Sequence, residues 1–144
     1  MRGCAGIKWK GNFMEIFKGR EIFAGKASGE LLFSSMPISF YGGVDATSGI
    51  VVEKGHPLEG KCMAGKVLAF PNGKGSTVGS YVLYRLKKAG KAPAGIINLE
   101  AETIVAVGAI ISEIPMMDKV EFEKLEKLDG KKVRMDASGG KLEI

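Results

Sequence analysis

The segment PNGKGST, residues 71–77, lies between two stretches of different pattern. The preceding run, 67–70, is entirely apolar, as is typical of a buried strand. The following segment, 77–89, predicts an amphipathic helix that ends at Gly90, because apolar residues recur at four-residue spacing while basic residues face water. The apolar stripe is Val78, Val82, Leu83 and Leu86. A strand that passes through a glycine turn into a helix favours an α/β fold.

Other short apolar runs are separated by turns rich in glycine, of which the chain has 21. They predict strands at 20–27, 29–34, 50–53, 94–99, 131–136 and 141–144. The last two would form a terminal hairpin. Residues 100–111 could form either a buried helix or a strand, although the acidic residues at their start favour a helix. This order predicts a mixed α/β fold with two β layers and a small helical layer.

Charge and hydropathy limit the partners. The net charge is +5, but basic residues are spread and interleaved with acidic ones. We therefore expect no nucleic-acid partner; an anionic small molecule or an acidic protein surface explains the charge as well. No apolar run reaches the roughly 20 residues of a membrane helix. The N-terminus lacks the apolar stretch of a secretory signal, so we expect a cytoplasmic protein without a membrane partner.

Cysteine and histidine are scarce. Cys4, Cys62 and His56 are the only residues of these types, and the cysteines lie far apart. Such a set cannot close a zinc site or supply the usual thiolates of an iron–sulfur cluster. We expect this chain to bind no metal or cofactor itself, so that other chains would supply most ligands of any metal. His56 lies in a Gly-His-Pro-Leu turn and is more often bonded to backbone there than a proton shuttle.

Ser76 is the main candidate for chemistry, and two interpretations remain open. Serine is a favoured helix N-cap, which explains it without function. Gly73 and Gly75, however, permit close approach of another group, and Lys74 suits a phosphate or carboxylate. Free amides at a helix N-terminus favour negative charge on a serine oxygen or a bound anion. The segment lacks the Walker A order and the GxSxG pattern, and a triad with His56 is not favoured.

A second glycine loop follows Phe40. Gly42, Gly43, Val44 and Asp45 form either an ordinary turn, with Asp45 as an Asx-turn residue, or a substrate-facing loop. In the second interpretation the glycine amides approach an anion. We expect the substrate-binding residues to be Gly42, Gly43, Val44, Asp45, Lys74, Gly75 and Thr77, with Ser76 as the catalytic residue.

An ordered set of short motifs gives a closer comparison. They are GGVD at 42–45, GI at 49–50, HPLEG at 56–60, PNGKGS at 71–76, GKAPA at 90–94, VGAII at 107–111 and IP at 114–115. Together they resemble the small subunit of the aconitase X family over about residues 20–118. Ala46, where proline is expected, and Thr77, where a second serine is frequent, depart from the pattern. The first ten or so residues lie outside the resemblance.

The resemblance implies a swivelling β/β/α domain, as in the C-terminal domain of aconitases. We expect one such domain over residues 1–144, with residues 1–12 as an extra N-terminal segment. It further implies a large partner subunit that carries an iron–sulfur cluster, of the 4Fe-4S type, and most of the substrate site. Ser76 becomes the implied proton acceptor.

The implied activity is that of a hydro-lyase subunit. A stand-alone chain resembles the archaeal branch of the family, whose reaction converts mevalonate 5-phosphate to trans-anhydromevalonate 5-phosphate on the way to isoprenoids. Two alternatives stay open: dehydration of another hydroxy acid such as cis-3-hydroxyproline, and a basic binding module without enzymatic activity.

Overall fold

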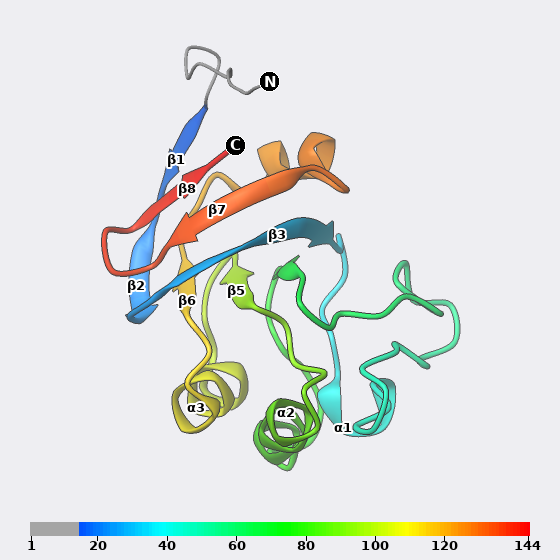
Figure 1. Cartoon of the computed structure of the whole chain (residues 1–144). Coiled ribbons are helices and arrows are strands. Elements are labelled where there is room, and N and C mark those ends of the chain that lie inside the picture. The colour runs from blue at the N-terminus through cyan, green and yellow to red at the C-terminus, as the bar shows by residue number, and fades with distance from the viewer. Residues whose placement is uncertain (1–14) are drawn as a thin grey trace.

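The structure is a computed structural model that describes residues 15–144 (Figure 1). Within them, the strands are β1 (Ile16–Lys18), β2 (Arg20–Phe23), β3 (Lys26–Phe33), β4 (Val67–Phe70), β5 (Gly95–Asn98), β6 (Met116–Asp118), β7 (Lys132–Asp136) and β8 (Lys141–Glu143). The helices are α2 (Gly79–Lys88), α3 (Thr103–Ser112) and the 3₁₀ helix η2 (Phe122–Leu128). The segment labelled α1 (Phe40–Gly43) is an irregular turn, because Tyr41 and Gly42 have non-helical dihedral angles.

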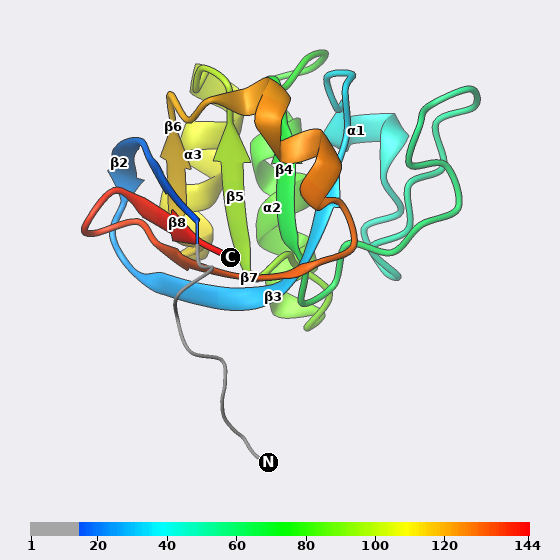
Figure 2. The same ribbon diagram turned by 90° about the horizontal axis from the view of Figure 1, so that it is seen from above.

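Strand β3 connects two differently paired layers. Its first part pairs antiparallel with β7, which continues to β8 and β1, whereas its last part, 31–33, pairs parallel with β4. From β4 the order runs through parallel β5 and β6 to antiparallel β2. Figures 1 and 2 show β4, β5 and β6 between the antiparallel layer and helices α2 and α3. The predicted mixed α/β fold with two β layers and a helical layer is confirmed.

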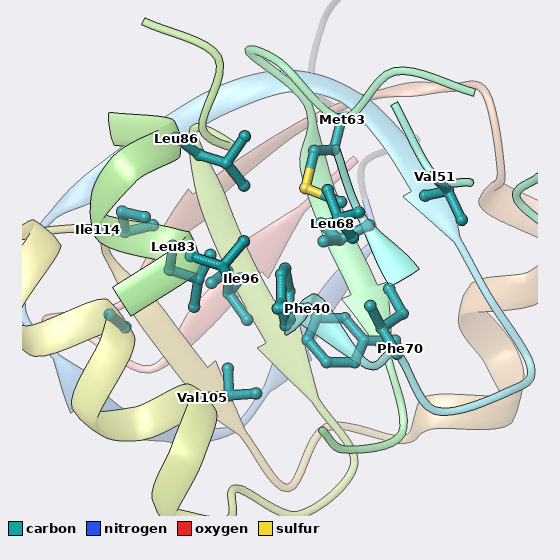
Figure 3. Packing of buried hydrophobic residues seen from close by; sticks show 14 of the residues in the cluster. Phe40, Val51, Met63, Leu68, Phe70, Leu83, Leu86, Ile96, Val105 and Ile114 are labelled. Carbon is teal, nitrogen blue, oxygen red and sulfur yellow. The ribbon is translucent and has the colours of Figure 1, made fainter. Parts of the chain in front are cut away.

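The middle layer is buried on both faces because it lies between the antiparallel layer and the helices. Successive strand residues point in opposite directions, so they pack alternately against one and the other. In β4, Leu68 and Phe70 belong to the cluster on the helical side, which also holds Ile96 of β5 and Leu83 of α2 (Figure 3). Val67 and Ala69 of the same strand belong to a second cluster, between the two β layers. An uninterrupted apolar run is what a strand buried on both faces requires.

The turns before both long helices place polar groups at the same edge of the parallel strands. Residues 100–111, left open between helix and strand, contain most of helix α3. The N-cap of this helix is Glu102, whose two carboxylate oxygens accept the N–H groups of Ile104 and Val105 at 2.8 Å. Helix α2 ends as predicted, with Gly90 at a φ of 72°. Val78 lies before α2 rather than on its buried face and is 44% exposed, so its place in the apolar stripe was wrong.

Two strand predictions need correction. Residues 50–53 form only isolated bridges, Val44 with Val51 and Ile50 with Cys62, because their loop folds back on itself. The predicted break at Ser28 lies instead at Gly25, where φ is 141° and a β-carbon would come within 2.8 Å of the Pro115 ring. Strand β3 therefore runs without interruption through Ser28 and Gly29.

Candidate functional site

Ser76 lies on an exposed turn immediately before α2. Its Oγ accepts the N–H of Val78 at 3.1 Å, and its carbonyl accepts the N–H of Gly79 at 3.0 Å. The N-cap position of α2 belongs to Val78, so the Ser76 hydroxyl braces the turn before the helix and is also open to solvent. This bond within the turn is compatible with a role toward an external ligand.

Gly75 allows the turn to approach a second loop. Its φ is 89°, and a β-carbon there would lie 2.6 Å from the Oγ of Ser39. The main chain supports the same approach, because the N–H of Lys74 donates to the carbonyl of Ile38 at 3.0 Å. The turn before α2 is thus held against the segment that leads into α1.

A shallow pocket of about 340 Å³ opens between these loops. Its lining residues are Ser39, Gly42, Gly43, Glu53, Lys74 and Gly75. The structure therefore brings together four of the predicted substrate-binding residues from two segments distant in sequence. Ser39 and Glu53 were not predicted. No local sequence pattern marks either residue, because both reach the pocket through contacts between segments that are distant in sequence.

Glu53 and Lys74 face each other in this pocket. The Nζ of Lys74 lies 3.1 Å from the Oε2 of Glu53, and the two side chains are 42% and 27% exposed, respectively. The N–H groups of Val52 and Glu53 donate to the carbonyl of Gly43, at 2.9 and 3.3 Å. These bonds hold the Glu53 backbone against the glycine loop, from which its side chain reaches Lys74.

Three of the predicted substrate-binding residues do not line the pocket, and neither does the predicted catalytic residue Ser76. Val44 is buried and bridges Val51. Asp45 forms an Asx turn in which Oδ1 accepts the N–H of Thr47 at 2.9 Å. That amide, with the Ser48 hydroxyl as a weaker contributor, lowers the pKa of the Asp45 carboxyl. The exposed Thr77 uses its carbonyl to accept the Oγ–H of Ser80 at 3.0 Å.

His56 is buried and has a structural role, which confirms its prediction as a turn residue bonded to backbone. Its Nδ1 accepts the N–H of Leu58 at 3.0 Å, so Nε2 carries the proton and donates to the carbonyl of Pro37, also at 3.0 Å. With both ring nitrogens engaged, the side chain has no position left for a serine-activating bond.

Across residues 15–144, no group of three or more His, Cys, Asp or Glu side chains could hold a metal ion. Cys62 is the cysteine within this range, and its thiol donates to the carbonyl of Ser48 at 3.4 Å. These residues do not fit an iron–sulfur cluster, which needs several thiolates at one place. Cys4 lies outside the described residues.

The helices within residues 15–144 include none that is both long and apolar enough to cross a membrane.

Comparison with known proteins defines the class. Residues 16–144 match the family described as the aconitase X swivel domain, and the chain belongs to this family. Among curated relatives, it is 60% identical over 128 residues to the phosphomevalonate dehydratase small subunit of Methanosarcina acetivorans, covering 88% of this chain and 89% of the relative. It is 58% identical over 127 residues to the protein of the same name from Thermococcus kodakarensis, covering 88% and 94%.

Two solved structures have the same fold as this chain. The crystal structure of Thermococcus kodakaraensis aconitase X in its holo-form superposes with a TM-score of 0.85 at 56% identity, covering 90% of this chain and 98% of that one. A solution NMR structure of a UPF0107 protein superposes with a TM-score of 0.79 at 46% identity, covering 89% and 97%. The predicted family and its swivelling fold are confirmed.

Proposed function

We propose that this chain is the small subunit of a hydro-lyase that dehydrates mevalonate 5-phosphate to trans-anhydromevalonate 5-phosphate. The observation that carries the proposal is its identity of 58–60% to phosphomevalonate dehydratase small subunits along 88% of its length. The same relatives favour this substrate over hydroxyproline. Assaying the assembled enzyme on both compounds tests that choice.

In this proposal Ser76 is the proton acceptor. The reaction removes a proton from the carbon beside the substrate carboxylate, and the bond between the adjacent carbon and its hydroxyl oxygen breaks. The hydroxide that leaves takes up a proton from solvent, so the net loss is one water. The N–H of Val78, 3.1 Å from Oγ, would stabilise the alkoxide form, as would the start of helix α2. The exposed position of Ser76 allows a substrate held by another subunit to reach it.

A large subunit completes the site in this proposal. The name "small subunit" carried by the relatives supports a larger partner. We assign the iron–sulfur cluster to that partner, because residues 15–144 offer no set of ligands for it. The shallow pocket would be covered when the subunits meet, which would exclude water from the reacting groups.

The test replaces the hydroxyl. Ser76→Ala in the reconstituted two-subunit enzyme should lower kcat by about 10²–10⁴-fold, the usual contribution of a general base, with little change in unfolding or subunit pairing. Ser138→Ala is the matched control, because Ser138 is another exposed serine whose Oγ accepts a backbone N–H, that of Gly25 at 2.9 Å. Near-normal turnover by Ser76→Ala would rule out Ser76 as the base.

A further inference from the structure

The pocket between the two glycine loops has one charge of each sign. Of its six lining residues, Lys74 and Glu53 alone are ionisable near neutral pH, and their charged atoms lie 3.1 Å apart. The positive charge that would attract an anion is therefore cancelled at the site itself. The remaining lining residues are three glycines and a serine.

Main-chain contacts hold the acidic partner in place. The Glu53 segment is hydrogen-bonded to the carbonyl of Gly43, and a β-carbon at Gly43 would lie 3.3 Å from Oε1 of Glu53. The carboxylate thus lies directly over a glycine of the pocket. Because exposed ion pairs contribute little to the stability of a fold, the effect of this pair on ligands matters more than its effect on folding.

The pair has different consequences for the two anionic ends of the proposed substrate. Phosphate sites present cationic side chains and free amides, and a carboxylate among them repels a dianion twice as strongly as a monoanion. The proton that Ser76 would accept lies beside the substrate carboxylate. Gly75, the residue before Ser76, lines the pocket, so the singly charged end belongs nearby.

We propose that Glu53 is a specificity-determining residue, which neutralises Lys74 so that this pocket receives the carboxylate end of the substrate and rejects the phosphate end. The phosphate then contacts the partner subunit. This inference rests on the proposed function for the identity of the substrate, but the charge selection itself can be measured without catalysis.

The experiment titrates the full-length, isotope-labelled chain with acetate and with sulfate, a tetrahedral dianion, at constant ionic strength. Amide NMR shifts of Gly42, Gly43 and Gly75 report binding. The wild type should bind acetate at least as well as sulfate. In Glu53→Gln the ratio of sulfate to acetate affinity should rise about fivefold or more, the effect of one unit charge at about 4 Å in water.

Three further variants make the result decisive. Lys74→Met combined with Glu53→Gln should abolish the gained sulfate binding. Glu143→Gln breaks a similar ion pair, with Arg134 at 3.1 Å on the antiparallel layer, and should leave both affinities unchanged. Glu53→Ala repeats the charge removal with a different side chain. An unchanged ratio in both Glu53 variants, or wild-type preference for sulfate at these amides, would overturn the proposal.

A second arm uses the reconstituted enzyme. Sulfate should compete with substrate more strongly in Glu53→Gln than in the wild type, raising KM by a factor that grows with sulfate concentration. If the assembled subunits do not dehydrate mevalonate 5-phosphate at all, the proposed function fails while the NMR titration still decides the role of Glu53.

Discussion

Asp45 shows, at the scale of one residue, how backbone amides control a charge. The N–H of Thr47 lies 2.9 Å from Oδ1 and favours the ionised carboxylate, which lowers the pKa. A folded-state pKa below the unfolded value gives a stabilisation that is present above the unfolded pKa. That stabilisation disappears as the pH falls through the folded pKa.

We predict that the Asp45 carboxyl carbon titrates in NMR with a midpoint below about 3.9, the ordinary aspartate value. Asp45→Asn should preserve the turn, because the amide oxygen can accept the same N–H, and should remove this contribution to the acid sensitivity of loop 42–49. A midpoint at or above the ordinary value would show that the Asx turn does not persist in solution.

Single residues of the site differ in how far sequence could predict them. Lys74 and Gly75 stand out because they interrupt a strand–helix transition with an unusual composition. Ser39 and Glu53 carry no such local signal. They reach the pocket through long-range contacts, such as the bond from Lys74 N–H to the carbonyl of Ile38, and pairings of this kind are not encoded by neighbours in sequence.

At the scale of elements, the turn at Gly75 combines a left-handed conformation with a close approach. Gly75→Ala should cost about 1–3 kcal/mol for the positive φ and more for the β-carbon that would lie 2.6 Å from Ser39 Oγ. It should also displace Ser76 and reduce turnover. Urea unfolding and steady-state kinetics measure the two effects.

Gly60→Ala separates these causes. Gly60 has a similar φ, 83° against 89°, but nothing lies within 4 Å of the β-carbon it would gain. We expect Gly60→Ala to show the conformational cost alone, with normal turnover. Equal destabilisation by the two variants would mean that the contact with Ser39 does not constrain the turn.

Elements with a strong local pattern were predicted well. The apolar run 67–70 became β4, the run 94–99 became β5, and the glycine-turned tail became the β7–β8 hairpin. The segment 50–53 is equally apolar at its start but forms no strand, because its bridges to Val44 and Cys62 are isolated pairs that do not extend into a ladder. Local pattern predicts where a strand can form, whereas pairing decides whether it does.

At the scale of the whole molecule, the sequence could not predict that β3 runs as one strand through two layers. The strand pairs with β7, about a hundred residues away in sequence, and with β4, much nearer. Its inner residues therefore serve different clusters: Leu32 packs on the helical side, and Leu31 packs between the β layers. This shared strand couples the two clusters mechanically.

Unfolding should reflect that coupling. Leu83 lies in the cluster under the helices, and Met135 lies in the cluster between the β layers; both are buried. We predict that Leu83→Ala and Met135→Ala each cost about 2–5 kcal/mol, from lost burial and the cavity left behind. Because they share no cluster, the double variant should be additive within about 0.5 kcal/mol.

Both variants should nevertheless shift one common transition, since the middle strands belong to both clusters. Urea unfolding followed by circular dichroism and by the amide resonances of Ile96 and Val133 would give coincident midpoints for each variant. If Leu83→Ala moved the midpoint at Ile96 and left that at Val133 in place, the layers would unfold separately. In that case β3 would connect the two layers without making them one cooperative unit.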